Sequence, residues 1–437
     1  MTEPPDSHER IDWTAPQRLT RLRRRHRANR RMQWLGLGAI LTAAGLLAVL
    51  VLSLLASGLP AFQQSYVTLS FDLKPALVNP QDMRRGKWRK IVRNALFAAL
   101  PEVKDRRLKR KVFRIVSRAA PYNLRDYVMK HPELVGKTIT HQVLLSDPFD
   151  QYVKGVIPAH IGAGAQQRFN PRLGGPEVLA AFEKLRRDGR ISLRFNRNLF
   201  LNADSRLPEQ AGLAGAIVGS FLMLLVTFII SFPAGIAAAV YLEEFAPKNR
   251  FTDFIEVNIN NLAAVPSVVF GLLGLALFIG YAGLPRSTPL VGGMVLSLMT
   301  LPTIIIATRA ALSAVPPSIR EAALGIGASR YQTVLHHVLP VAMPGILTGA
   351  IIGMARALGE TAPLLLIGMN AFIPDVSGMG ISEPATALPT QIYSWADSPE
   401  RGFVARTSAA ILVLLGFLLA MNSTAIWLRQ RYGRRTW

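Results

Sequence analysis

Two opposite charges lie in the middle of an otherwise apolar stretch of the chain. Gly345–Met369 reads GILTGAIIGMARALGETAPLLLIGM and is long enough to cross a bilayer, yet it contains Arg356 and Glu360, four residues apart. An arginine at mid-bilayer costs about 2.5–3.5 kcal/mol on insertion scales unless it faces a partner or a watery cavity. The planar guanidinium keeps its charge and matches the oxygens of an oxyanion. The stretch therefore predicts either a structural ion pair within one helix or the charged wall of an anion path.

Small residues in the same stretch predict a helix that packs closely against a neighbour. They recur at every fourth position: Gly345, Gly349, Gly353 and Ala357. Because Arg356 and Glu360 lie at the edge of this stripe, we expect them to point into the protein interior and not toward lipid. Pro363 cannot donate a hydrogen bond to the carbonyl of Gly359, so we also expect the helix to kink beside Glu360.

Glu360 would repel an anion if it were ionised and unpaired. We therefore expect Glu360 to hold Arg356 in place by accepting hydrogen bonds from it. Arg309, at the inner end of another apolar run, is a second candidate for the wall of the path. A snorkelling arginine at the membrane interface would give the same pattern.

Half of the 437 residues are hydrophobic, and six apolar runs have about the length needed to cross a bilayer. They are Trp34–Leu59, Gly212–Tyr241, Asn261–Gly280, Pro289–Thr308, Gly345–Met369 and Thr407–Leu428. We therefore expect an all-α membrane protein with six transmembrane helices. Arg356 and Glu360 lie in the fifth run, and Arg309 directly follows the fourth.

The composition excludes several classes of site. The chain has no cysteine, which excludes disulfides and thiolate catalysis, and its 7 histidines show no spacing typical of a metal site. HPELVGKT, residues 131–138, approaches the pattern of a phosphate-binding P-loop but has His131 in place of the first glycine. We expect no cofactor, no metal and no ATP hydrolysis by this chain. The net charge of +23 lies mostly beside the apolar runs and in one long loop, without a nucleic-acid-binding motif, so we expect no nucleic-acid partner.

The positions of the arginines predict the side of the membrane that each loop occupies. Arg18–Arg31 carries eight arginines directly before the first run, and four more follow Leu428. We therefore place both termini in the cytoplasm. The apolar run is too long, and the basic run starts too late, for a cleavable signal peptide. The predicted segments are a basic cytoplasmic segment (1–33), the first transmembrane helix (34–59), an extracytoplasmic domain (60–210), the main transmembrane domain (211–429) and a basic cytoplasmic tail (430–437).

Residues 60–210 are long enough to fold as a small domain. They contain 28 Lys and Arg against 13 Asp and Glu, a surplus of 15 on the side predicted to be outside. Long loops cross the membrane largely regardless of charge, so this surplus does not reverse the predicted orientation. Helical spacing of apolar residues within Lys87–Ala120 predicts a mostly helical or mixed domain. These apolar residues include Ile91, Leu96, Leu100, Val112, Ile115 and Val116.

The loop between the fourth and fifth runs reads EAALGIGASRYQTVLHHVLP over Glu321–Pro340. Glu321–Ala323 begins a helix whose small side chains allow another surface to approach closely. Gly327 permits a turn that other residues disfavour. A second amphipathic stretch, Tyr331–Leu339, follows, and we expect Pro340 to end it. The pattern predicts a helix-turn-helix on the cytoplasmic face.

This loop resembles the EAA loop of ABC transporter permeases, which contains Glu-Ala-Ala, a glycine six residues after the glutamate, and a final Leu-Pro. In such permeases the loop docks on a separate ATP-hydrolysing subunit and transmits its movement. The resemblance implies that the ATPase-coupling residues here are Glu321, Ala322, Ala323 and Gly327. His337 departs from the pattern, since the family usually has an aliphatic residue there.

Four further segments resemble the PstA family, the permease subunits of phosphate ABC importers. They are NNLAAVPSVVFGLLGLALF from Asn260, LPTIIIATRAALSAVP from Leu301, RALGETAPLL from Arg356 and PTQIYSWADSPERGF from Pro389. The resemblance implies a type I ABC permease core in the cell inner membrane that forms half of a phosphate path, in which Arg356 and Glu360 act in transport. Besides membrane lipid, it implies a PstC-like sister permease, a PstB-like ATP-binding subunit and a PstS-like extracytoplasmic phosphate-binding protein.

Alternative functions share many of these features. A permease for another oxyanion, such as molybdate or sulfate, or the sister phosphate permease would have similar spans. A membrane phosphate sensor would instead use residues 60–210 to bind its ligand. A membrane-bound enzyme is disfavoured, because no acid–base pair or nucleophile converges in or beside the runs. We therefore interpret the chain as a non-catalytic transport subunit.

Overall fold

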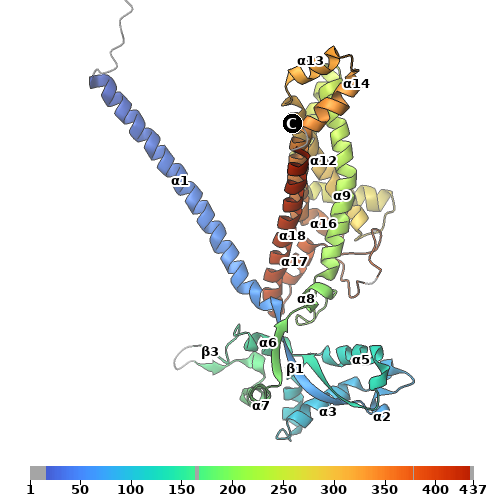
Figure 1. The fold of residues 1–437 in the computed structure, drawn as a ribbon. Coiled ribbons are helices and arrows are strands. Elements are labelled where there is room, and N and C mark those ends of the chain that lie inside the picture. The colour runs from blue at the N-terminus through green and yellow to red at the C-terminus, as the bar shows by residue number, and fades with distance from the viewer. Residues whose placement is uncertain (1–15, 163–166, 377, 434–437) are drawn as a thin grey trace, which may run out of the picture. The chain divides into compact units, whose positions relative to one another are not determined.

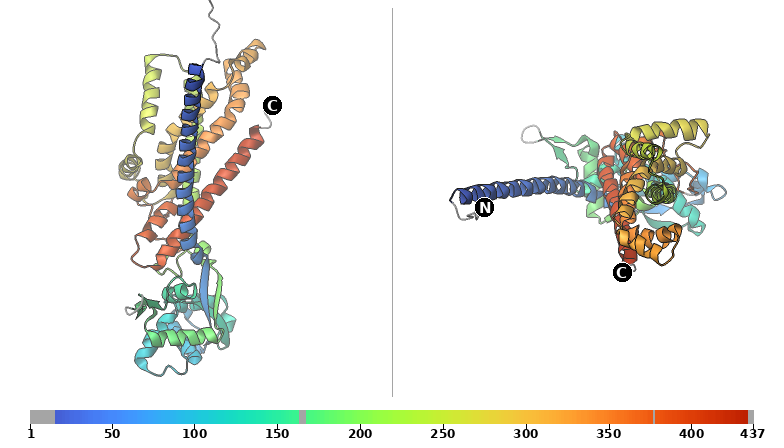
Figure 2. Two further views of the ribbon diagram at one scale, coloured as in Figure 1. Left: turned by 90° about the vertical axis from the view of Figure 1, so that its left-hand side faces the viewer. Right: turned by 90° about the horizontal axis from the view of Figure 1, so that it is seen from above.

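The computed structural model describes residues 16–162, 167–376 and 378–433 (Figure 1). The chain divides into two units, residues 1–56 and 57–437. The first unit is formed by helix α1 (Pro16–Gly58), which is one uninterrupted helix (Figure 2). The basic run and the first apolar run are therefore parts of the same helix.

Residues 60–210, here called the inserted domain, form a mixed α and β domain. Its three-stranded antiparallel sheet has the order β2-β1-β5, with β1 (Gln63–Asp72) in the centre, β2 (Thr138–Leu144) and β5 (Ile191–Phe195). Val67 of β1 is opposite Val143 on one side and Ile191 on the other. Two short strands, β3 (His160–Ile161) and β4 (Arg168–Phe169), pair antiparallel. The sequence allowed a helical or a mixed domain, and the structure is mixed, so the all-α description holds for the membrane helices only.

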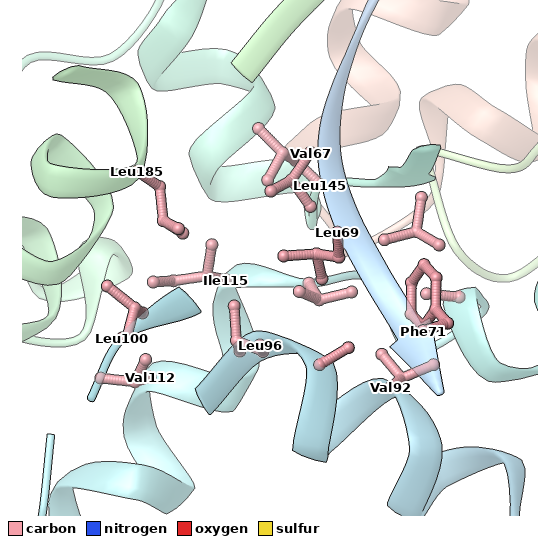
Figure 3. Packing of buried hydrophobic residues seen from close by; sticks show 14 of the residues in the cluster. Val67, Leu69, Phe71, Val92, Leu96, Leu100, Val112, Ile115, Leu145 and Leu185 are labelled. Carbon is pink, nitrogen blue, oxygen red and sulfur yellow. The ribbon is translucent and has the colours of Figure 1, made fainter. Parts of the chain in front are cut away.

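The core of the inserted domain forms on one face of this sheet. Alternate residues of β1, Val67, Leu69 and Phe71, are buried against helix α3 (Trp88–Ala99). The predicted apolar residues from Ile91 to Val116 all belong to this core, and Figure 3 shows several of them directed into one cluster. The helical pattern is thereby confirmed. The other helices of the domain are α2 (Pro75–Val78), α4 (Arg106–Val112), α5 (Ala120–Lys130), α6 (Asp147–Val153), α7 (Pro176–Arg187) and α8 (Asn198–Leu201), with short 3₁₀ turns at Leu59–Phe62, Met83–Arg85, Phe113–Ile115, Pro132–Leu134 and Pro171–Leu173.

The segment that approaches the P-loop pattern has a different geometry from a P-loop. A P-loop leads from a strand into a helix, whereas here a 3₁₀ turn, Pro132–Leu134, leads through Gly136 into strand β2. Lys137 and Thr138 therefore do not lie at a helix N-terminus that could hold a phosphate.

Among the described residues, five helical segments are long and apolar enough to cross a membrane: Leu22–Phe62, Ala214–Phe245, Pro289–Ser313, Arg330–Gly359 and Gly402–Arg431. They contain α1, α9 (Ala214–Val240) with a π-helical end at Tyr241–Phe245, α12 (Pro289–Ser313), α15 (Leu339–Gly359) and α18 (Gly402–Gly433). The count of six is reached only if a bent pair is taken as one span.

The predicted third span, Asn261–Gly280, is divided in the structure between two helical parts that meet at a sharp bend. The structure has α10 (Arg250–Ala263), then α11 (Ser267–Leu273) continued by a π-helical segment, Gly274–Tyr281, with a bend of 102° between the two parts. Pro266 directly precedes α11 and favours an extended residue before it, which explains the break.

The predicted fifth span, Gly345–Met369, is wrong at both ends. The helix already begins at Arg330 with α14 (Arg330–Gln332) and a π-helical segment, Thr333–Val338, so Pro340 does not end it. At the other end α15 stops at Gly359, and a separate short helix, α16 (Ala362–Leu366), follows. The remaining helices are α13 (Pro317–Gly325) and α17 (Leu388–Ala396).

Candidate substrate path and coupling elements

The stripe of small residues on α15 packs closely against a neighbouring helix, as the sequence predicts, and that helix is α12. A side chain added at Gly345 would meet Ala311, one at Gly349 would meet Ala307, and one at Gly353 would lie near Thr300 and Ile304. Gly353 therefore lies level with the middle of α12, and Arg356 follows it by one turn. The candidate charges are thus placed at mid-depth of the helix bundle.

Arg356 and Glu360 form an ion pair with 3.6 Å between Nε and Oε1. This separation is too long for a hydrogen bond, so the expected hydrogen bonds from Arg356 to Glu360 are not formed. Glu360 is the first residue beyond α15 and has extended backbone angles (φ −77°, ψ 123°). The predicted irregularity beside Glu360 is therefore present, but as a helix end and not as a kink.

The environment of the pair differs from the expectation of an enclosed site. The Arg356 side chain is 48% exposed and that of Glu360 is 20% exposed. The neighbouring small residues face α12, and the described residues leave about half of the Arg356 side chain uncovered. A guanidinium with free donors on a membrane helix can bind an anion only if another subunit or water covers that face.

Arg309 is held by two carboxylates at the end of α12. Its Nε lies 3.2 Å from Glu243 Oε2, and its Nη2 lies 2.7 Å from Glu256 Oε1. The hydroxyl of Ser313 donates a hydrogen bond of 2.6 Å to the other oxygen of Glu243. The arginine thus connects α12, α10 and the end of α9, and neither pure snorkelling nor a free path charge describes it.

A second arginine, Arg320, pairs with Glu244, the residue that follows Glu243. Arg320 of α13 contacts Glu244 Oε1 at 2.7 Å and also donates to the carbonyls of Val315 and Leu312, at 2.7 and 2.9 Å. The charge network is defined here as Glu243, Glu244, Glu256, Arg309 and Arg320. It ties α13 to the ends of α9 and α12. Sequence reasoning missed its carboxylates, although the paired acids of YLEEF directly after an apolar run were a usable signal.

The predicted helix-turn-helix is confirmed in α13 and α14. Gly327 has φ +89°, a left-handed conformation that favours glycine, and it reverses the chain between the two helices. Ser329 caps α14: its side chain accepts from the amide of Gln332, whose side chain accepts from the Ser329 amide in return. The first helix begins at Pro317, four residues before the predicted start at Glu321.

The outer surface of the helix-turn-helix combines small, apolar and acidic groups. Glu321 and Ala322 are exposed, as is Gly327. The coupling face is defined here as these residues together with the exposed apolar side chains of Leu324, Ile326 and Tyr331, of which Ile326 is 81% exposed. Ala323 is buried and packs inward, unlike its three companions. His337 is exposed, so the departure from an aliphatic residue leaves no polar group in the core.

Comparison with known proteins identifies this architecture. Residues 231–436 match the family model described as binding-protein-dependent transport system inner membrane component. The chain is 32% identical over 237 residues to the probable ABC transporter permease protein YqgI of Bacillus subtilis, covering 51% of this chain and 80% of that protein. It is 32% identical over 228 residues to the phosphate transport system permease protein PstA of Haemophilus influenzae, covering 52% of this chain and 78% of that protein. The chain belongs to the PstA family of ABC transporter permeases.

The PstA-family similarity does not extend to the whole chain. Residues 19–162 match a domain of unknown function, DUF3333. A structure of the methionine ABC transporter MetNI in an inward-facing conformation matches with a TM-score of 0.42 and 17% identity, covering 50% of this chain and 97% of that chain. The helix-turn-helix, the charge network and the Arg356–Glu360 pair all lie in the permease region.

In this PstA-family chain one arginine of the permease region lies buried against the inserted domain. Arg406 of α18 is 4% exposed. Its Nη1 donates to the carbonyl of Ala211 at 2.6 Å, and its Nη2 donates to Oε1 of Gln64 in β1 at 3.0 Å. No local signal in the sequence distinguishes Arg406 from Arg401.

Carboxylates from the inserted domain surround this arginine. These carboxylates, the basic residues that pair with them and Arg406 itself are called the junction cluster: Asp147, Asp150, Lys154, Arg172, Glu209 and Arg406. Asp150 accepts from Lys154 at 2.5 Å and from the Ser65 amide at 2.8 Å, and Arg172 contacts Asp147 at 3.0 Å. Gly402 lies so close to Asp147 that any side chain there would collide with the carboxylate. The cluster therefore fixes the start of α18 to α6.

Burial changes the acid–base properties of these groups. Burial raises the pKa of Asp147, opposed by the hydrogen bond from Gln151 and the charge of Arg172. Burial also raises the pKa of Glu209, opposed by a hydrogen bond from Ser117. The pKa of Lys154 is lowered by burial and partly restored by Asp150. Each charge is thus in an environment that disfavours it unless the opposite charges are present.

Proposed function

We propose that this chain is one of two permease subunits of an ATP-driven importer of inorganic phosphate. The observation that carries the proposal is the half-exposed guanidinium of Arg356 at mid-depth of a bundle similar to phosphate transport permeases. A phosphate oxyanion requires compensation of its charge within the membrane, and a guanidinium supplies it in any physiological pH range. Glu360 lies 3.6 Å from Arg356 and would orient its guanidinium. It would release Arg356 when phosphate arrives. The sister permease would cover the face that this chain leaves open.

The orientation of the chain in the membrane follows from the same proposal. The helix-turn-helix and the inserted domain lie at opposite ends of the permease helices (Figure 1). We place the helix-turn-helix in the cytoplasm on a separate ATP-hydrolysing subunit, and the inserted domain outside. Both termini are then cytoplasmic, and the α1 arginines lie on the side that the positive-inside rule favours. A binding protein would deliver phosphate from the outside.

The charge network could transmit movement of the ATPase to the permease helices. ATPase movement would act on the coupling face, and Arg320 and Arg309 would pass it to α9 and α12 through Glu244 and Glu243. We therefore assign Arg309 to coupling and not to the wall of the path. Alternating access follows if closure of the ATPase favours one arrangement of these helices.

Uptake by reconstituted vesicles tests the function. Vesicles that contain this chain with its sister permease and ATPase, supplied with the binding protein, should accumulate phosphate when ATP is present. Ala322→Trp should abolish this uptake, because the bulky ring prevents close approach to the coupling face, whereas Ala282→Trp in an exposed loop should leave it intact. Preferential uptake of sulfate or molybdate would assign the chain to another oxyanion. Phosphate-dependent association with a kinase or phosphatase, without uptake, would identify a sensor instead.

Replacing Arg309 with methionine should uncouple ATP hydrolysis from transport. The change leaves Glu243 and Glu256 without their shared partner, at an expected stability loss of about 1–3 kcal/mol for partly buried charged hydrogen bonds. We expect the maximal uptake rate to fall severalfold with little change in KM, and Glu243→Gln to have the same effect. Arg250→Met, at an exposed position of α10, is the control. A raised KM for phosphate, with ATP hydrolysis still coupled to uptake, would show that Arg309 belongs to the wall of the path.

A further inference from the structure

One segment of the inserted domain carries a high density of positive charge. Residues 84–118 contain 14 Lys and Arg against two acids, Glu102 and Asp105, which is half of the 28 basic residues of the whole domain. Thirteen of the 14 are exposed, and Lys109 is partly exposed. These residues form the basic face: Arg84, Arg85, Lys87, Arg89, Lys90, Arg93, Lys104, Arg106, Arg107, Lys109, Arg110, Lys111, Arg114 and Arg118.

Two cation–π contacts connect the basic residues of α3 to the α4 region. The guanidinium of Arg89 in α3 lies over the ring of Phe113, which directly follows α4, at 5.7 Å from its centroid. Lys109 of α4 lies over the ring of Phe97 in α3 at 5.4 Å. These two cation–π contacts run in opposite directions between the helices. The apolar sides of both helices meet in the domain core (Figure 3).

The positive charges of this face are almost uncompensated within the described residues. Glu102 pairs with Lys184 of α7, outside the face. Asp105 accepts from the amide of Leu108 and is used as the N-cap of α4. Arg85 has an exposed ion pair with Asp82, which contributes little in water. Such a concentration of like charge destabilises the folded domain, and an anionic partner would relieve the repulsion.

The chemistry of the face selects the kind of partner. Nine of its 14 basic residues are arginines, which suit bidentate contacts with phosphate. No large apolar side chain is exposed within the described residues 84–118, so the face lacks both the apolar centre of a protein interface and the groups that insert into a membrane. The face therefore fits a flexible polyanion whose phosphates are repeated along a chain, with the charges making many exchangeable contacts.

We propose that the basic face binds linear phosphate polymers, with inorganic polyphosphate as the model ligand. The site lies on α3 and α4, and the permease helices are contacted by other parts of the domain, among them α6, α8 and the Leu59–Phe62 turn. Binding would hold phosphate in polymeric form on the inserted domain, independently of the Arg356 path. The proposal goes beyond phosphate import and does not rest on it.

Binding of fluorescent long-chain polyphosphate to the full-length chain in nanodiscs of neutral lipid tests this site. Affinity should fall steeply between 50 and 200 mM salt, with a log–log slope of about −0.7 for each phosphate neutralised, as for single-stranded polyanions. The fourfold variant R106Q/R107Q/R110Q/K111Q should lower the magnitude of that slope by about 3. Uptake in reconstituted vesicles is a separate measurement and can fail or succeed independently.

A matched variant separates a specific face from total charge. K130Q/K137Q/R168Q/R187Q removes four exposed basic residues of the inserted domain outside the face and should leave the slope unchanged. An equal loss in both variants would overturn the proposal, as would weak binding without salt dependence. Binding to phosphatidylglycerol vesicles or to an acidic protein, without binding of polyphosphate, would also overturn it. Thermal unfolding of each variant must match the parent, since a misfolded domain would lose the ligand for a trivial reason.

Discussion

Replacing Arg356 with glutamine should lower ATP-driven phosphate uptake by about 10- to 100-fold while the chain still inserts and binds its ATPase. Glutamine keeps a polar group of similar length but removes the charge and the fork. A hydrogen bond to a charged group contributes about 1.5–3 kcal/mol, and each 1.4 kcal/mol changes a rate or an affinity tenfold. The measurement is the initial uptake rate in reconstituted vesicles, with bound ATPase determined in the same preparation.

The partner residue decides between the two interpretations of the ion pair. If the pair is purely structural, the double variant R356Q/E360Q should recover uptake, because removal of both charges leaves neither uncompensated. If Arg356 contacts the substrate, the double variant should remain as inactive as R356Q. Arg356→Lys should retain part of the activity, since it keeps the charge and loses the bidentate geometry. Arg286→Gln, in an exposed loop, is the matched control. Normal uptake by R356Q would remove this residue from the path.

Elements that depend on local sequence were predicted closely. α12 begins at Pro289, the predicted residue, because a proline in the first turn after the capping Thr288 is a local signal for a helix start. The turn at Gly327 was equally readable, since a left-handed backbone is a property of one residue. The stripe from Gly345 to Ala357 identified the packing face of α15, though not the helix that it packs against.

The missed features depend on contacts that are distant in sequence. The chain stays apolar beyond the end of α15 because Leu364, Ile367 and Met369 belong to the same hydrophobic core as the last turns of α15. Hydropathy therefore does not show that the helix ends at Gly359. Arg309 and Glu243 are 66 residues apart, and Arg406 and Gln64 are 342 apart. No periodicity pairs such residues. The exposure of Arg356 was missed for the same reason, since the stripe locates one face of a helix and does not tell what covers the next.

Replacing Arg406 with methionine should loosen the contact between the inserted domain and α18 by about 3–5 kcal/mol. Methionine has a similar length and keeps the packing, but it leaves three carboxylates of the junction cluster, Asp147, Asp150 and Glu209, opposed only by Lys154 and Arg172. Removing one member of a buried charge cluster has about this effect. Amide hydrogen exchange in α6 should accelerate by about 100- to 4,000-fold, which is the free-energy change converted at 1.4 kcal/mol per tenfold.

The stability lost on replacing Arg406 with methionine should increase as the pH rises. The pKa values of Asp147 and Glu209 are already raised in the folded chain, and the missing positive charge should raise them further. A carboxyl whose pKa is higher in the folded than in the unfolded state binds more protons when folded, so stability falls as pH rises between the two pKa values. The variant should therefore be closest to the parent near pH 5 and most destabilised at pH 7 and above. Arg401→Met removes an exposed arginine five residues earlier in the chain and should change exchange in α6 little at either pH. Equal exchange in R406M and the parent at neutral pH would show that the inserted domain is held to α18 by apolar contacts and not by this cluster.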